Sequence, residues 1–217
     1  MNHSEPVARE GWPFIGLFAA VAAGLYWMAG TSGALAGLVL TGFGVFFFRN
    51  PQRQIVQQKG TVVAPADGRV MDVKIMAEDH YIHDRVIRVR IFLNIFNVHI
   101  NRVPIAGKVE WIEKVSGLYL PAYKDEASDK NARNYVGIVT EWGKILVVQI
   151  TGLIARRLVC WVQVGDNLQT GQRFGLIRFG SCTEIYLPQL ASILVEPGQK
   201  VKGGETVIAR FYEQEQR

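Results

Sequence analysis

The sequence is poor in cysteine and histidine, and one long stretch of it has no charge. Its 217 residues include 2 Cys and 4 His. Cys160 and Cys182 are too few for a disulfide framework or a cysteine zinc site, and we expect no metal site. The 24 basic and 19 acidic residues are interspersed, without a Lys/Arg run or an RNA-binding signature. The net charge of +5 therefore favours an anionic membrane surface as partner, and no nucleic acid.

The uncharged stretch covers residues 11–48. As one straight helix it would be about 57 Å long, well beyond the ~30 Å hydrocarbon core of a bilayer. Gly30, Thr31, Ser32 and Gly33 interrupt it. We therefore predict a membrane hairpin in residues 1–48, made of two helices at about 12–29 and 34–48. A cleaved signal peptide, a buried soluble hairpin and a shallow re-entrant hairpin are the alternatives.

Basic residues follow the second apolar run, whereas the predicted turn has no charge. Arg49, Arg53 and Lys59 lie just beyond Phe48. Because positive charge is retained on the cytoplasmic side, both ends of the hairpin should face the cytoplasm. This places a soluble domain, residues 49–217, on the cytoplasmic face of the cell membrane.

The soluble part is typical of a mainly β domain. Short apolar or alternating runs end at turn residues. The runs are 86–93, 144–151, 158–164 and 206–212, and the turns include 65–68, 104–107 and 197–198. The polar stretch 121–134 is predicted to be a helix or a loop.

An internal repeat indicates a more specific architecture. Residues 165–174 and 198–207 both show glycine and apolar residues alternating at three-residue steps. Glycine permits the positive φ that tight turns need, and the apolar residues point inward. Paired turns of this kind resemble the hammerhead turns of biotinyl/lipoyl-type barrel sandwiches. The segment 175–194 would then be a strand pair with an insertion; two coincidentally similar hairpins are the alternative.

Two polar residues, His99 and Asp67, are candidates for chemistry. His99 interrupts the apolar run 92–104, and buried polar groups need partners. Asp67 follows Pro65 and precedes Gly68, which is also ordinary turn chemistry. Either residue is a catalytic candidate or a structural one. His80 and His83 lie in a polar connection and are expected in a solvated loop.

No Gly-x-Ser-x-Gly elbow surrounds Ser181, so a hydrolase site is not indicated. Several motifs follow one another along the chain: Phe47-Phe48-Arg49-Asn50-Pro51-Gln52-Arg53, Ala64-Pro65-Ala66-Asp67-Gly68, Asn97-Val98-His99-Ile100-Asn101-Arg102, Gly152-Leu153-Ile154-Ala155-Arg156-Arg157, Phe179-Gly180-Ser181 and Tyr186-Leu187-Pro188. Taken together, these ordered motifs resemble the pyruvoyl-dependent phosphatidylserine decarboxylases, short prokaryotic class. The departure from the family pattern is Cys182, which leaves the Gly-Ser pair intact.

The resemblance implies a self-cleaving lyase. The chain would break between Gly180 and Ser181, and Ser181 would become a covalent pyruvoyl cofactor. The large chain, 1–180, and the small chain, 181–217, would stay together as a heterodimer. The pyruvoyl group would form a Schiff base with phosphatidylserine in the membrane, releasing CO2 and phosphatidylethanolamine.

The resemblance also implies roles for further residues. His99 would be the base that takes the Ser181 proton, and Asp67 would orient its imidazole, by the logic of Ser-His-Asp hydrolases. His99 is also the candidate for the protonation step of turnover. Arg156 and Arg157 would bind the substrate phosphate or carboxylate, or else contact anionic headgroups.

Two other classes of function remain open from the residues themselves. The first is a membrane-tethered biotinyl/lipoyl-like carrier or phosphotransfer module, although no Met-Lys-Met run is present. The second is a non-enzymatic membrane scaffold. Both predict one uncut chain. The sequence determines neither the acyl-chain preference nor the oligomeric state, and it leaves a higher oligomer open.

Overall fold

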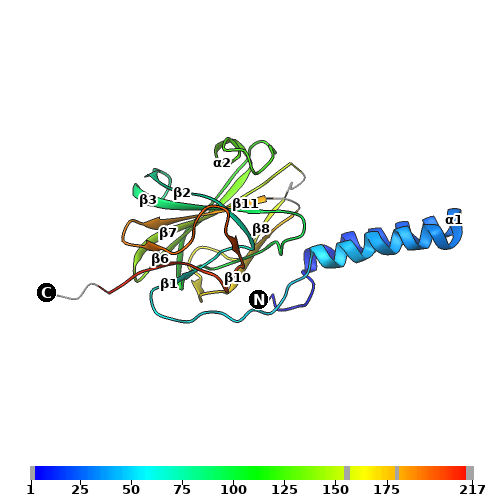
Figure 1. Cartoon of the computed structure of the whole chain (residues 1–217), viewed down its shortest axis with the longest axis horizontal. Coiled ribbons are helices and arrows are strands. Elements are labelled where there is room, and N and C mark those ends of the chain that lie inside the picture. Colours follow the sequence, from blue (N-terminus) through cyan, green and yellow to red (C-terminus); the bar gives the residue numbers. More distant parts are fainter. Residues whose placement is uncertain (1–2, 154–156, 179–180, 214–217) are drawn as a thin grey trace. The chain divides into compact units, whose positions relative to one another are not determined.

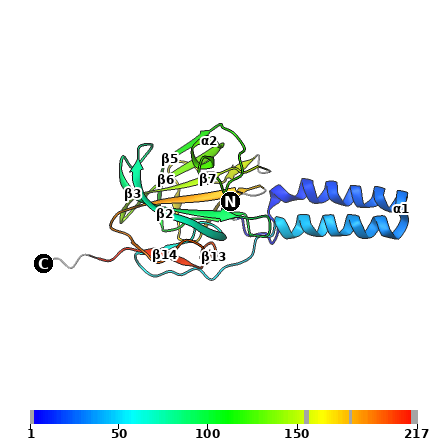
Figure 2. The ribbon, with the colours of Figure 1, turned by 45° about the horizontal axis from the view of Figure 1, so that its top comes forward.

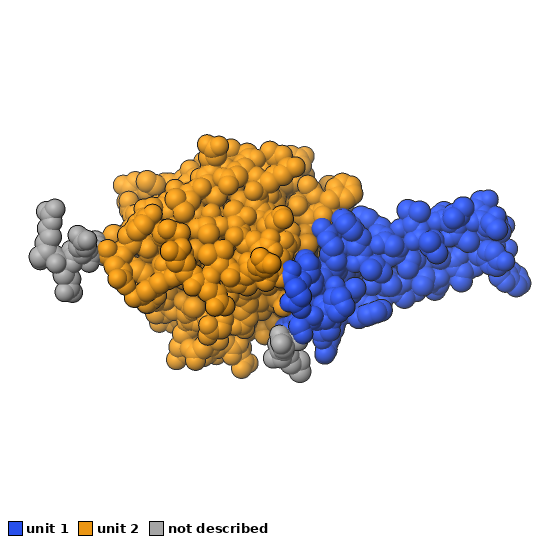
Figure 3. Space-filling model, turned by 60° about the horizontal axis from the view of Figure 1, so that its bottom comes forward, with its two compact units in different colours: residues 1–52 blue, residues 53–217 orange. Residues whose placement is uncertain are grey.

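The computed structural model describes residues 3–153, 157–178 and 181–213. It divides the chain into two units, Met1–Gln52 and Arg53–Arg217 (Figure 3). The first is helical and the second is almost entirely β (Figure 1). This boundary lies four residues beyond the predicted one.

Unit 1 is built on one apolar helical element, α1 (Trp12–Phe47), preceded by the short 3-10 helix η1 (Arg9–Gly11). Within the described residues, α1 alone is long and apolar enough to cross a membrane. The predicted pair of separate helices with a four-residue turn is wrong in its boundaries, because helical structure runs through residues 31–33. The break is confined to Gly30, with φ 59° and ψ −140°, values that glycine adopts without steric penalty.

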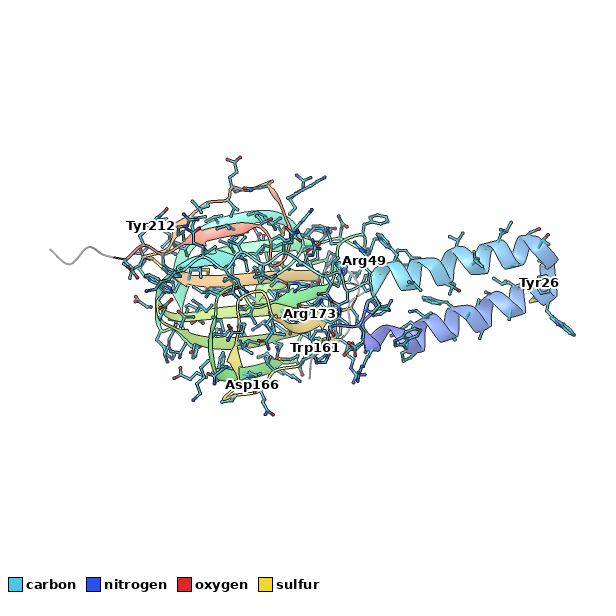
Figure 4. All side chains as sticks on the ribbon, turned by 90° about the horizontal axis from the view of Figure 1, so that it is seen from below. Tyr26, Arg49, Trp161, Asp166, Arg173 and Tyr212 are labelled. Carbon is cyan, nitrogen blue, oxygen red and sulfur yellow. The ribbon has the colours of Figure 1, made fainter. Side chains whose placement is uncertain are left out.

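The two parts of α1 on either side of Gly30 lie side by side (Figure 2). Gly37 packs so closely on Ala22 that a Cβ at Gly37 would come within 2.3 Å of the Ala22 Cα. The segments before and after the helical element of unit 1 also meet, since Ala8 N donates to Phe48 O and Asn50 N donates to Pro6 O. Figure 4 shows Tyr26 at one end of this unit and Arg49 at the other.

The described strands of unit 2 form three sheets. The largest has the order β13-β2-β3-β11-β7-β6-β5-β9, and the others are β1-β14-β12 and β4-β10-β8. The bounds are β1 Thr61–Val63, β2 Gly68–Glu78, β3 Asp84–Leu93, β4 Ile100–Arg102, β5 Gly107–Val115, β6 Arg133–Thr140, β7 Gly143–Ile150, β8 Leu158–Cys160, β9 Asn167–Leu168, β10 Arg173–Ile177, β11 Ser181–Pro188, β12 Ser192–Ile193, β13 Lys200–Val201 and β14 Val207–Arg210.

This arrangement confirms the mainly β prediction and most of the predicted strand positions. The run 158–164 is strand only over β8, and stretch 121–134 contains one short helix, α2 (Ala127–Lys130), before β6 begins. The predicted strand pair at 175–194 is wrong. Its strands β10, β11 and β12 belong to three different sheets, because their partners come from distant parts of the chain.

The two repeats occupy equivalent places at the two ends of the large sheet. β9 pairs with β5 and β13 pairs with β2. The first glycines, Gly165 and Gly198, have φ of 98° and 92°, as the turns require. Their amides bond equivalent valines: Gly165 N donates to Val109 O, and Gly198 N donates to Val70 O.

The large sheet has a core on each face. Alternate residues of a strand point to opposite faces, so β11 contributes to both. Ile185 and Leu187 belong to the larger cluster, whereas Cys182 and Tyr186 belong to the smaller one. β11 lies between β3 and β7 over most of its length, in the middle of the sheet (Figure 1).

Candidate active site

Ser181 is the first residue of β11 and lies opposite Leu93 of β3. It is fully buried, and its Oγ has no hydrogen-bond partner among the described residues. Buried hydroxyls in folded proteins are nearly always hydrogen-bonded. Such a buried hydroxyl is therefore unusual, and the position fits a group that reacts. Gly180, the other half of the predicted cleavage site, lies outside the described residues.

His99 lies immediately before β4 and is also fully buried. Its Nδ1 is 3.0 Å from the carbonyl oxygen of Asn97. Its own carbonyl oxygen accepts a hydrogen bond of 3.1 Å from the amide of Ile177, the last residue of β10. A backbone hydrogen bond thus links His99 to Ile177, which lies four residues before Ser181 in the chain.

A chain of buried uncharged side chains joins β4, β11, β7 and β6. Asn101 Nδ2 donates to Thr183 Oγ1 at 2.9 Å, and Gln149 Nε2 donates to Asn101 Oδ1 at 2.8 Å. Asn134 Nδ2 donates to Gln149 Oε1 at 3.0 Å. We call these four residues the amide network. All four are fully buried, so their hydrogen bonds fix the relative positions of the strands that bear them.

The amide network links the segments that bear the two main candidates, His99 and Ser181. Thr183 lies two residues after Ser181, and Asn101 lies two residues after His99. Because residues two apart in extended chain point to the same face, the direct bond between Asn101 and Thr183 favours a common face for His99 and Ser181. The structure thereby brings the histidine motif and the Gly-Ser segment together across strands.

Asp67 occupies the turn before β2, with its side chain 14% exposed. Its Oδ2 accepts a hydrogen bond of 2.8 Å from Arg53, and its Oδ1 accepts one of 2.8 Å from the amide of Gly203. The neighbouring Pro65 carbonyl accepts from Arg102 N, so this turn adjoins β4. These contacts engage both carboxylate oxygens, and a direct contact between Asp67 and His99 stays a prediction.

The remaining predicted residues fall at the edge of the described region. Arg156 lies outside the described residues. Arg157 is exposed, and its carbonyl oxygen accepts a hydrogen bond of 3.3 Å from Arg178 N. Arg157 is therefore close in space to the segment that precedes the Gly-Ser pair, and its role in substrate binding stays a prediction.

Cys182 points to the face of β11 opposite Ser181. Burial raises the pKa of the Cys182 thiol well above its ordinary value, and the nearby Glu184 carboxylate raises it further. The thiol is therefore protonated at neutral pH and is a poor nucleophile. The side chain that departs from the family pattern is thus not a competing nucleophile next to Ser181.

Sequence reasoning missed a second polar cluster, on the same face of β11 as Cys182. Arg88 and Arg90 alternate with apolar residues in β3, opposite Tyr186 and Glu184 of β11. Arg88 lies 3.0 Å from Asp72 and 3.7 Å from Glu184. Ser128 and Tyr186 each donate to Glu184 at 2.6 Å. We call these six residues the charged cluster. Charged residues within the apolar strands 86–93 and 181–188 were its only local signal.

Comparisons with known proteins place the sequence among characterised relatives. A sequence model of the phosphatidylserine decarboxylase family matches residues 40–209. The chain is 50% identical over 209 residues to a phosphatidylserine decarboxylase proenzyme of Symbiobacterium thermophilum, covering 94% of this chain and 95% of that one. It is 44% identical over 213 residues to the Burkholderia cenocepacia proenzyme, covering 97% and 99%.

The chain therefore belongs to the phosphatidylserine decarboxylase family, in its short prokaryotic form. Membership confirms the predicted class of enzyme, a carboxy-lyase made as a proenzyme, and its predicted cofactor, a pyruvoyl group made from a serine. It decides against the carrier, phosphotransfer and scaffold alternatives.

Proposed function

We propose that this chain matures by cutting itself between Gly180 and Ser181, and then decarboxylates phosphatidylserine in the membrane. The observation that carries the assignment is Ser181 itself, buried at the start of β11 without a hydrogen bond to its Oγ among the described residues. The products are a large chain, residues 1–180, and a small chain, residues 181–217.

Maturation needs a base for a weak nucleophile. Ser181 Oγ attacks the carbonyl carbon of Gly180, and the amide becomes an ester as the serine nitrogen leaves. Loss of the Ser181 α-proton breaks the ester Cβ–O bond, which releases the Gly180 carboxylate and leaves dehydroalanine. Its tautomer takes up water and loses ammonia, giving the pyruvoyl end.

His99 is the proposed base in this sequence, because it is the buried histidine whose backbone bonds the strand that leads to Ser181. The Asn97 carbonyl at Nδ1 favours the tautomer that bears its proton there, leaving Nε2 as the basic nitrogen. Asp67, as part of the proposed triad, adds negative charge that stabilises the imidazolium.

In turnover the pyruvoyl group supplies an electron sink for the carbon that loses CO2. The chain supplies position and a proton. His99 is proposed to deliver that proton to the former α-carbon, and the buried surroundings of Ser181 limit access of water.

The two chains are proposed to stay together after cleavage as a heterodimer. β11 in the small chain hydrogen-bonds to β3 and β7 of the large chain along most of its length, and β14 pairs with β1. The internal repeat supports the finer description of the fold, a barrel-sandwich-like domain, because its copies hold equivalent ends of the large sheet.

The helical unit is proposed to anchor the enzyme as a membrane hairpin. Residues 12–29 and 31–47 would be about 27 Å and about 26 Å long, close to the ~30 Å hydrocarbon core, once α1 reverses at Gly30. Arg49 and Arg53 follow this segment, which favours the cytoplasmic face for residues 53–217. A substrate with two acyl chains stays in the bilayer, so an anchored enzyme meets it there.

The test compares histidine variants during expression. His99→Ala should accumulate uncut chain, because loss of a general base typically slows a reaction by ~10²–10⁴. The matched control is His83→Ala, whose side chain lies in an exposed turn. Denaturing gels over time give the cleavage rate. Full cleavage of His99→Ala would remove His99 from maturation.

A further inference from the structure

A cavity of about 610 Å³ opens where β2, β3 and β13 end, beside the candidate active site. Its volume is in the range of small-molecule sites in proteins. The lining residues are Asp67, Gly68, Arg69, Phe92, Asn94, Phe96, Asn97, Lys200, Val201 and Lys202.

The charged wall of this cavity is mainly cationic. Arg69, Lys200 and Lys202 contribute positive charge, and among the described residues Lys200 has no ion pair. The negative charge of Asp67 is offset by Arg53 at 2.8 Å. Lys202 lies 4.0 Å from Glu205, which Arg53 also contacts. The two exposed ammonium groups of Lys200 and Lys202 therefore favour an anionic ligand.

The lining also includes aromatic side chains, Phe92 and Phe96. Phe96 is 63% exposed and lies in a turn that side-chain hydrogen bonds stabilise. Asn94 N donates to Asn97 Oδ1, and Phe96 N donates to Asn94 Oδ1, both at 2.9 Å. Exposed Phe side chains are among those that enter the boundary between lipid headgroups and acyl chains. Cationic groups and an exposed aromatic ring in one cavity suit a ligand that is an anion at one end and apolar at the other.

The cavity also adjoins the candidate active site, because Asp67 and Asn97, whose carbonyl oxygen lies 3.0 Å from His99 Nδ1, line it. Ser181 lies opposite Leu93, and the next residue, Asn94, lines the cavity. Neighbouring strands are ~4.8 Å apart. In phosphatidylserine, only a few bonds separate the amine that reacts from the phosphodiester.

We infer that this cavity holds the phosphodiester of phosphatidylserine, with Lys200 and Lys202 as its cationic partners and Phe96 beside the start of the acyl chains. The inference rests on the proposed assignment of Ser181 as the residue that becomes the pyruvoyl group. It assigns the cationic contacts with the substrate to the small chain, which also bears the proposed reacting group.

The test uses the full-length, self-cleaved enzyme in mixed detergent micelles. The variant is Lys200→Gln/Lys202→Gln, and the control is Lys114→Gln/Lys124→Gln, which removes two exposed lysines that do not line the cavity. We expect the KM for phosphatidylserine to rise about tenfold or more in the first variant, because charge-assisted hydrogen bonds are lost, with kcat nearly unchanged. The control should keep the wild-type KM.

Two further measurements separate a headgroup site from general attraction to an anionic surface. Glycerophosphoserine, which lacks acyl chains, should inhibit the wild type competitively, and its inhibition constant should rise in parallel with KM. Lys200→Arg/Lys202→Arg should retain most of the affinity.

An unchanged KM in Lys200→Gln/Lys202→Gln would overturn the inference. So would an unchanged inhibition constant for glycerophosphoserine together with weaker binding to phosphatidylglycerol vesicles, since the lysines would then serve only the membrane surface. Failure of the wild type to cut at Ser181 is a separate outcome, which removes the proposed function instead.

Discussion

The two faces of β11 carry two kinds of buried polar group. On one face, beside Ser181, Thr183 belongs to the amide network, which has no formal charge. On the other face, Glu184 belongs to the charged cluster with Arg88 and Arg90 of β3. The network beside Ser181, the proposed reacting residue, fixes geometry without adding a formal charge. The charged cluster links β11, which would become part of the small chain, to β3 of the large chain on the face that does not bear Ser181.

The difference also predicts how each face responds to mutation. A buried ion pair adds little net stability, because desolvation offsets the attraction, but removal of one partner leaves an uncompensated charge. Loss of a neutral hydrogen bond costs less energy but releases the strands that hold the reacting groups. Variants of the charged cluster should therefore affect stability first, and variants of the amide network should affect maturation first.

The largest contrast is expected between adjacent residues that point to opposite faces. Ser181→Ala should abolish self-cleavage and decarboxylation, because no hydroxyl remains to attack Gly180. Cys182→Ala should still mature, since its thiol is buried and protonated. Denaturing gels and CO2 release measure both. Cleavage of Ser181→Ala would contradict the assignment of the reacting residue.

Glu184→Leu should give the largest loss of stability. Glu184 is 1% exposed, and its removal leaves Arg88 with one carboxylate partner fewer in a buried site. We expect a loss of about 3–5 kcal/mol in the free energy of unfolding. Urea unfolding in the uncut Ser181→Ala background measures it, with the exposed Glu113→Leu as control. Equal stability of the two variants would show that the charged cluster does not hold β11.

Thr183→Val should slow maturation with a smaller effect on stability. The substitution leaves the Asn101 amide without its 2.9 Å acceptor, which costs about 1–3 kcal/mol. If that energy keeps Ser181 in position for the proposed base, His99, the cleavage rate should fall ~10-fold or more. Thr183→Ser keeps the hydroxyl and should restore the rate. A Thr183→Val chain that cleaves at the wild-type rate would separate the amide network from the site.

The smallest effect is a pH dependence on the charged face. Burial raises the pKa of Cys182, so above the ordinary thiol pKa the unfolded chain loses a proton that the folded chain keeps. The stabilising contribution is complete below that value and declines as pH rises. In the Ser181→Ala background, the chain with Cys182 should lose about 1–2 kcal/mol between pH 7 and pH 10 relative to Cys182→Ala. Parallel urea curves at both pH values would contradict the buried thiol.

Local patterns were sufficient for much of the fold and for the candidate residues. Alternating apolar residues marked the run that forms β3, and glycines at three-residue steps marked the turns around β9 and β13. The pairing of β10, β11 and β12 in three sheets could not be predicted, because it depends on partners far away in the chain. For the same reason the bond between Asn101 and Thr183, 82 residues apart, had no local signal.

The central claim, self-cleavage at Gly180–Ser181, is tested most directly by the mass of the purified protein under denaturing conditions. The account predicts two chains. The larger should have the mass of residues 1–180 with an ordinary carboxyl end. The smaller should match residues 181–217 less one ammonia, and should gain mass with hydroxylamine at its carbonyl end. A single full-length chain in an active preparation would contradict the account.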